Sequence, residues 1–285
     1  MKRITATDLP AVLWVAALML AMTACAPDPD DAGRAEEVPQ TPVTFIEHAD
    51  GLLWLGAPPA AHQLGAARLS VAARGIARVR ATGCGAAAHG TAFAVAPRLL
   101  VGAAHVITGA SKIEIHVARD DTAEPLRFAA EVVGFSPGSD LALLRTDAEV
   151  PPMGLDRARL GAVAAVLGYP TGSALQASPA RVEHLVWASG LWGDGVRRKV
   201  YILAADVRAG QSGAPLVDRH GRVAGVAFAA ASGRAEIAFA LSRDELLSFL
   251  VSAGIDARID HRGRTVVRAS AERLRPVANG ACEFR

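Results

Sequence analysis

Net charge, aromatic side chains, cysteine and long apolar runs are all scarce in this chain of 285 residues. The formal net charge is +2, and aromatic residues make up 5% of the chain. With neither a basic stripe nor an aromatic platform, the sequence does not indicate nucleic-acid binding. The apolar run over residues 11–24 is shorter than the ~20 residues that span a bilayer. Because 51% of the residues are hydrophobic, we expect a globular protein with a substantial core.

The sequence also lacks the alternation of helices and strands that is typical of parallel α/β folds. From about residue 69 onward, segments of strand length are separated by turns that contain Gly, Pro and Asp. The segment KIEIHVA, residues 112–118, alternates and places Ile113, Ile115 and Val117 on one face. This pattern predicts an all-β fold made of barrels or a sandwich.

One helix is predicted after the last strand, over residues 243–253. Ser242 and Glu245 have the spacing of a capping box, and Gly254 is a stop signal. The remaining residues, 255–285, form a polar tail.

The first 25 residues have the features of an export signal. Lys2 and Arg3 precede the apolar run, and the run ends in MTAC at Cys25. A small residue before a cysteine at this position resembles a bacterial lipobox, which predicts a lipid anchor on Cys25. Cleavage after Ala26 is one alternative, because ACA also fits a simple signal-peptidase site, and an uncleaved anchor is the other. All three would export the protein. Residues 26–68 are interpreted as a disordered, Pro-rich acidic tether followed by an N-terminal extension.

The odd number of cysteines points to a division of roles. If Cys25 carries lipid or is removed, Cys84 and Cys282 remain as a pair. Outside the cytoplasm these two thiols can form a disulfide, which is our prediction. Two buried free thiols are the alternative.

The segment GQSGAPLVD, residues 210–218, places Ser212 between small residues just before an apolar strand. A serine on such a tight loop can have backbone N–H groups beside it that form an oxyanion hole. His105 ends LLVGAAH, where small residues allow close packing under its ring. Asp140 precedes the apolar segment LALL, where a carboxylate can be partly buried and can orient a histidine, although it can also simply begin the strand.

The order His105, Asp140, Ser212 matches that of chymotrypsin-fold proteases. The segments VGAAHV, SDLALL and GQSGAPLVD resemble the catalytic motifs of trypsin-like serine proteases of the HtrA-type branch. The segments GTAFAVAP, VLGYPTG, GRVAGVAFAAA and the terminal GAC resemble the periplasmic acid-resistance serine proteases of actinobacteria (MarP type).

This resemblance implies two six-stranded antiparallel β-barrels followed by a C-terminal helix, with the protease domain at residues 69–254. Barrel 1 is expected at about 69–150 and barrel 2 at about 151–242, with the site between them. About thirty residues follow Gly254, too few for a PDZ domain.

The resemblance also assigns roles around the serine. The catalytic residues would be His105, Asp140 and Ser212, with the N–H groups of Gly210 and Ser212 as oxyanion donors. Asp206 occupies the position that lines the base of the specificity pocket in trypsin-like enzymes and would select Arg or Lys there, unless it only caps a turn. In that second case Phe228 to Ala231, including Ala230, would define the pocket.

Three residues depart from the usual motifs. Gly102 and Ala214 replace more common residues, and Gln211 stands where digestive enzymes have an aspartate that pairs with a newly cut N-terminus. HtrA-type enzymes have a neutral amide at this position, so the change does not imply inactivity.

The sequence therefore predicts an exported serine endopeptidase that acts on proteins or peptides without a metal or cofactor. It would lie outside the cytoplasm, in the periplasm or cell envelope, where a lipid on Cys25 would anchor it to a membrane, or else it would be secreted. A catalytically weak binding protein with the protease fold is the alternative function.

Overall fold

The computed structural model describes residues 56–83, 85–119, 122–171, 173–188, 196–231, 234–261 and 265–280. The predicted leader and tether, Cys25, Cys84 and Cys282 lie outside these residues. No helix in the described part of the chain is long and apolar enough to cross a membrane.

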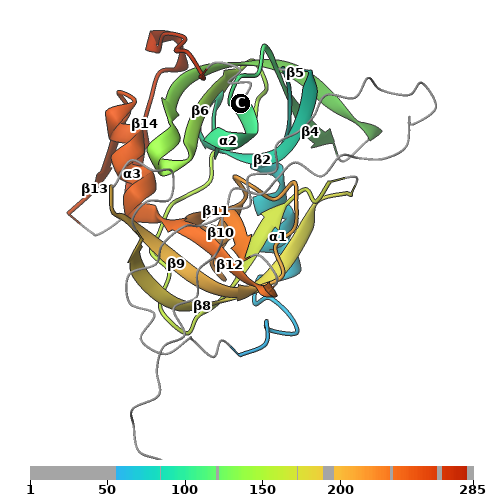
Figure 1. Cartoon of the computed structure of the whole chain (residues 1–285), viewed down its shortest axis with the longest axis vertical. Coiled ribbons are helices and arrows are strands. Elements are labelled where there is room, and N and C mark those ends of the chain that lie inside the picture. The colour runs from blue at the N-terminus through green and yellow to red at the C-terminus, as the bar shows by residue number, and fades with distance from the viewer. Residues whose placement is uncertain are drawn as a thin grey trace, which may run out of the picture. The chain divides into compact units, whose positions relative to one another are not determined.

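Six antiparallel strands form a closed barrel in the order β1-β2-β3-β6-β5-β4 (Figure 1). Pairing of β1 with β4 closes it, with Val79 opposite Ile115. Ile113 and Ile115 point into this barrel, as the alternation in KIEIHVA predicts. The strands are β1 (Ile76–Gly83), β2 (Ala86–Ala96), β3 (Leu99–Ala103), β4 (Lys112–Arg119), β5 (Thr122–Ser136) and β6 (Leu141–Thr146).

A second closed barrel has the equivalent strand order, β7-β8-β9-β12-β11-β10. Pairing of β7 with β10, with Val166 opposite Leu216, closes this barrel. The predicted all-β double barrel is thus confirmed. The strands are β7 (Val163–Gly168), β8 (Gln176–Ala188), β9 (Arg198–Ala205), β10 (Pro215–Val217), β11 (Val223–Ala231) and β12 (Arg234–Ser242).

The buried apolar side chains form separate clusters inside each barrel and a further cluster that joins the two barrels. The joining cluster brings Phe93 and Leu143 of the first barrel together with Leu167 and Val223 of the second. Burial of this apolar surface favours one fixed arrangement of the barrels, so residues from both can build a single site.

The predicted C-terminal helix is α3 (Arg243–Ser252), one residue shorter than expected. The Ser242 hydroxyl accepts the N–H of Glu245 at 3.4 Å, as the capping box predicts. Leu246, Leu247, Phe249 and Leu250 bury the inner face of α3 in the cluster that joins the barrels.

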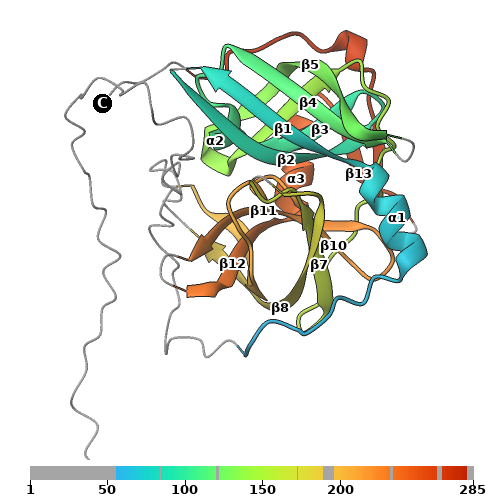
Figure 2. The same cartoon turned by 90° about the vertical axis from the view of Figure 1, so that its right-hand side faces the viewer.

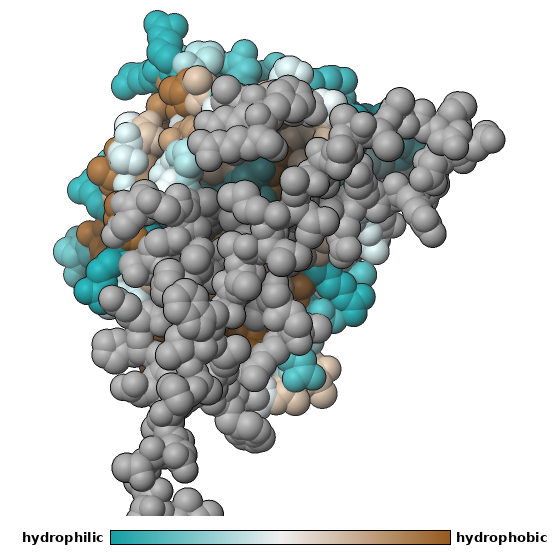
Figure 3. Space-filling model, viewed as in Figure 1, coloured by the Kyte–Doolittle hydropathy of each residue, from teal (hydrophilic) through white to brown (hydrophobic). Residues whose placement is uncertain are grey.

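The sequence did not predict helix α1 (Ala66–Arg74) or the hairpin in the tail. Helix α1 lies beside the junction of the barrels and adds Ala72 to the joining core (Figure 2). The polar tail contains a hairpin of β13 (Asp256–Ile259) and β14 (Thr265–Arg268). Polar and apolar side chains alternate over the flank that carries α3 and this hairpin (Figure 3).

Candidate active site

His105 lies on α2 (Ala104–Ile107), a single helical turn that follows the buried strand β3 directly. The sequence places His105 where a strand meets two alanines and a short turn, and the structure has β3 end at Ala103 with one helical turn directly after it. The other three residues of the turn, Ala104, Val106 and Ile107, are buried and fix it against the core. The His105 side chain remains 28% exposed and faces the space between the barrels.

Asp140 is almost completely buried, with 1% of its surface exposed, at the end of the short 3₁₀ turn Pro137–Ser139. Its φ of 50° is in the left-handed region, which aspartate tolerates better than most residues do. The Asp140 carbonyl accepts the N–H of Ala104 at 3.1 Å. This conformation aims the carboxylate at α2.

Both carboxylate oxygens of Asp140 contact His105. Oδ1 accepts the backbone N–H of His105 at 2.8 Å, and Oδ2 lies 2.7 Å from Nδ1 of the ring. A carboxylate only accepts, so this contact assigns the ring proton to Nδ1. Nε2 is then left with a lone pair that can take a proton, as a general base requires.

Ser212 lies in a loop in which some backbone N–H groups form hydrogen bonds and others do not. The N–H groups of Gln211, Gly213 and Ala214 donate to Arg208, Ala227 and Gln211 at 3.0, 2.7 and 2.9 Å, in that order. The N–H groups of Gly210 and Ser212, by contrast, donate to no group in the described part of the chain. Buried or half-buried N–H groups are normally paired, so this unpaired couple is available to an anionic oxygen.

The peptide unit between Ala209 and Gly210 is held in one orientation. Its carbonyl accepts the N–H of Thr171 at 2.9 Å. Because C=O and N–H point in opposite directions in a trans peptide, the N–H of Gly210 points away from Thr171. Gly210 has φ of +90°, and a Cβ on it would lie 2.4 Å from the carbonyl oxygen of Tyr169, so glycine is required here.

Thr91, on β2 of the first barrel, braces this loop of the second barrel. Its backbone N–H donates to the Ser212 carbonyl at 2.9 Å, and its hydroxyl donates to the Gly210 carbonyl at 2.8 Å. The same hydroxyl oxygen accepts the N–H of Tyr169 at 3.0 Å. Sequence reasoning did not single out Thr91, and the available signal was a hydroxyl within the otherwise apolar segment GTAFAVAP.

Gln211 is fully buried, and both ends of its amide are bonded. Oε1 accepts the N–H of Arg208 at 2.9 Å, and Nε2 donates to the Ser178 hydroxyl at 3.2 Å. Gln211 thus makes neutral hydrogen bonds at the position where digestive relatives need an aspartate that pairs with a new N-terminus.

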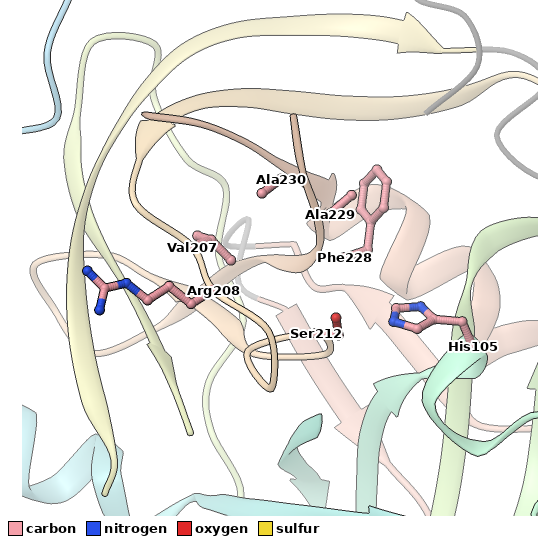
Figure 4. Close-up of a pocket in the computed structure, with 7 residues that line it drawn as sticks. All are labelled: His105, Val207, Arg208, Ser212, Phe228, Ala229 and Ala230. Atoms are coloured by element: carbon pink, nitrogen blue, oxygen red, sulfur yellow. The ribbon is translucent and has the colours of Figure 1, made fainter. Parts of the chain in front are cut away.

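A pocket opens beside His105 and Ser212 (Figure 4). The His105 ring is directed toward Ser212, whereas the guanidinium of Arg208 points away from both. The rest of the lining is apolar and comprises Val207, Phe228, Ala229 and Ala230.

Asp206 does not line this pocket. Its carboxylate forms an ion pair with the guanidinium of Arg208, with Oδ2 2.6 Å from Nη2 and 3.1 Å from Nε. The structure therefore brings Phe228 and Ala230 to the pocket and leaves Asp206 outside it. No cluster of three or more His, Cys, Asp or Glu side chains that could hold a metal ion occurs among the described residues.

The double-barrel fold is that of trypsin-like peptidases, and the trypsin-like peptidase domain family matches residues 90–226. The chain belongs to that family. It is 36% identical over 178 residues to the serine protease Rv3671c of Mycobacterium tuberculosis, a match that covers 60% of this chain and 43% of the relative. The chain therefore matches less than half the length of that curated relative.

Solved structures agree. The crystal structure of the Rv3671c protease from M. tuberculosis in its active form has 30% sequence identity and a TM-score of 0.66, over 88% of this chain and 99% of that one. The HtrA-type protease AlgW with tripeptide has 24% identity and a TM-score of 0.57, over 67% of each chain, and this likeness is one of fold.

Proposed function

We propose that the protein is an exported serine endopeptidase. The observation that carries the proposal is the contact of both Asp140 oxygens with His105, in a pocket that also contains Ser212. The similarity to a protein named a serine protease, crystallised in an active form, supports it.

The mechanism uses only side chains and backbone groups of this chain. Nε2 of His105 takes the proton of the Ser212 hydroxyl as Oγ attacks the carbonyl carbon of a peptide bond. The N–H groups of Gly210 and Ser212 stabilise the resulting oxyanion. The imidazolium then gives its proton to the leaving amine as the C–N bond breaks, and an acyl-enzyme remains.

Hydrolysis of the acyl-enzyme repeats these steps with water. His105 takes a proton from the water, and the hydroxide attacks the ester carbon. The Ser212 oxygen leaves with the proton returned by His105. Asp140 holds the ring and stabilises its charged form throughout.

Cleavage of a peptide library by the purified protein tests this proposal. The expected result is cleavage by the wild type and at least a thousandfold lower rate with Ser212→Ala. The alternative, a binding protein with the protease fold, predicts no cleavage by either form.

We further propose that the pocket accepts apolar side chains before the scissile bond. Its lining is mostly alanine, valine and phenylalanine, and Arg208 is held by Asp206. A cationic side chain would lose hydration in such a pocket without gaining an anionic partner.

The signal segment and the cysteines lead to two proposals about the mature protein. The first is export, with lipid on Cys25 that retains the protein at the membrane. Mass spectrometry of the native N-terminus should find a modified Cys25, whereas an unmodified start at Pro27 would indicate simple secretion.

The second is a disulfide between Cys84 and Cys282. Gly83 and Asn279 approach the same loop: a Cβ on Gly83 would lie 2.4 Å from the carbonyl oxygen of Gly109, and the N–H of Gly109 donates to Asn279 at 3.0 Å. The two cysteines are one and three residues away along the chain. Peptide mapping without reduction should recover the linked peptides, and two free thiols in the exported protein would refute the bridge.

A further inference from the structure

Basic side chains line the outer face of the first barrel. On β1, Ala77 and Val79 point inward, so Arg78 and Arg80 point outward. The strand register places outward-facing residues of the neighbouring strands beside them. We call the following set, whose positive charge comes from its three arginines, the basic strip: Arg78, Arg80, His89, His116 and Arg127.

The basic strip begins at the candidate active site. Thr91, which is paired with Arg78 across the sheet, donates its N–H to the Ser212 carbonyl. The Arg78 guanidinium donates to the Ser173 carbonyl and lies 5.1 Å from the centre of the Tyr169 ring. Tyr169 in turn packs against Gly210 through its carbonyl. Arg78 is therefore next to the loop that carries the proposed oxyanion donors.

Carboxylates compensate only part of this charge. Glu114 pairs with Arg80 at 3.3 Å and with Lys112 at 3.0 Å. Arg78 and Arg127 have no carboxylate partner in the described part of the chain. Burial, followed by the charges of Arg80 and Arg78, lowers the pKa of His89, which is consistent with a positive potential along the strip.

We infer that the basic strip is a subsite for acidic side chains on the leaving-group side of the scissile bond, an inference that rests on the proposed peptidase function. The apolar pocket takes the side chain that precedes the bond. No residue of β2 lines the apolar pocket, whereas Thr91 of β2 contacts Ser212 and Tyr169 lies beside Gly210. A segment that follows the bond and leads away from the pocket therefore passes β2 and Tyr169. Carboxylates of that segment would pair there with Arg78, which is half-buried and has no carboxylate partner among the described residues, and the exposed Arg127 adds to the attraction. Such pairing favours binding and orientation of an acidic segment over a neutral or basic one.

Internally quenched peptides that differ only at the second and third residues after the bond test this inference. Glu-Glu, Gln-Gln and Lys-Lys versions are compared by kcat/KM at low salt. We expect the Glu-Glu peptide to exceed the Lys-Lys peptide by about tenfold, with Gln-Gln between them and with the preference reduced by salt.

The preference should fall to within about threefold in Arg78→Gln/Arg80→Gln. Arg219→Gln/Arg258→Gln removes the same charge elsewhere and should keep the wild-type ratio. Because each ratio is taken within one protein, a general loss of activity cancels. Arg78→Gln alone serves if the double variant does not fold.

Fluorophosphonate labelling distinguishes a failure of the basic subsite from a failure of the proposed peptidase function. Labelled Ser212 together with equal cleavage of all three peptides would overturn the basic subsite and leave the peptidase proposal intact. Unlabelled Ser212 and no cleavage would overturn both. A Glu-Glu preference that persists in Arg78→Gln/Arg80→Gln would place the subsite elsewhere and overturn this assignment.

Discussion

The carboxylate of Asp140 holds His105 at two points, the backbone N–H at 2.8 Å and the ring Nδ1 at 2.7 Å. The first contact fixes where α2 starts, and the second fixes the tautomer and the direction of the ring. Both come from a buried residue in the left-handed conformation. Strained backbone of this kind is often retained at functional sites, because the surrounding structure compensates for it.

Asp140→Asn should separate these two contacts. The amide oxygen can still accept the backbone N–H of His105, but the NH₂ group then faces Nδ1 and favours the tautomer in which Nε2 is protonated. Because that tautomer cannot take the Ser212 proton, we expect kcat to fall about 10⁴-fold with the fold retained. Steady-state kinetics and circular dichroism measure this, with exposed Asp147→Asn as control. A loss below tenfold would remove Asp140 from the mechanism.

Thr91→Val replaces the hydroxyl with a methyl group of similar size. The Gly210 carbonyl and the Tyr169 N–H then lose their buried partner, so the loop that carries the N–H groups of Gly210 and Ser212 is held less firmly. We expect kcat to fall roughly 10- to 100-fold, with a smaller change in KM. Peptide aldehyde inhibitors should weaken in parallel, because they also place an oxyanion in the hole. Thr91→Ser keeps the hydroxyl and should restore most of both; equal losses in the two variants would make Thr91 purely structural.

Acid should destabilise the protein in part through His116. Its Nε2 atom is buried without a partner among the described residues. Burial, followed by the charge of Arg127, lowers the pKa of His116 below its ordinary value of 6.5, although Glu114 opposes this and Arg78 and Arg80 add to it. Below pH 6.5 the unfolded chain therefore binds a proton that the folded chain does not, and the free energy of unfolding falls until the folded pKa is reached.

His116→Gln cannot titrate, so its Tm should fall less between pH 7 and pH 5 than the wild-type Tm does. Exposed His220→Gln is the matched control. Parallel Tm curves for wild type and His116→Gln would contradict the prediction.

Cleavage profiling tests the role of Asp206. If the apolar lining defines the pocket, residues such as Leu, Val or Ala should precede the scissile bond at least tenfold more often than Arg or Lys. Asp206→Ala should not change this order. A strong preference for Arg or Lys that disappears in Asp206→Ala would instead make Asp206 the base of the pocket.

The short turn-bounded segments and the alternation in KIEIHVA were enough to predict an all-β fold, because strand patterning is a local signal. The double barrel itself was implied by the resemblance of the ordered motifs to those of trypsin-like proteases. Helix α1 gave a weak signal, since its alanine-rich sequence has little contrast between faces, and Ala72 is its only fully buried residue. The β13–β14 hairpin is short and mostly exposed, and strands of four residues carry almost no periodicity.

Contacts between the barrels were beyond sequence reasoning. The Thr91 hydroxyl bonds to the Gly210 carbonyl, which is 119 residues away along the chain, and no local sequence pattern predicts such a contact. The contact of Asp206 is local, by contrast. Its carboxylate pairs with Arg208, only two residues further along the chain, and is therefore held outside the pocket.

The central claim is that Ser212 is a nucleophile activated by His105. Its most direct measurement is the mass of the peptide that contains Ser212 after treatment of the folded protein with a fluorophosphonate. We expect one phosphonyl group on the Ser212 oxygen, and none in His105→Ala treated in the same way. An unmodified Ser212 in the folded wild type, or equally fast labelling of His105→Ala, would contradict it.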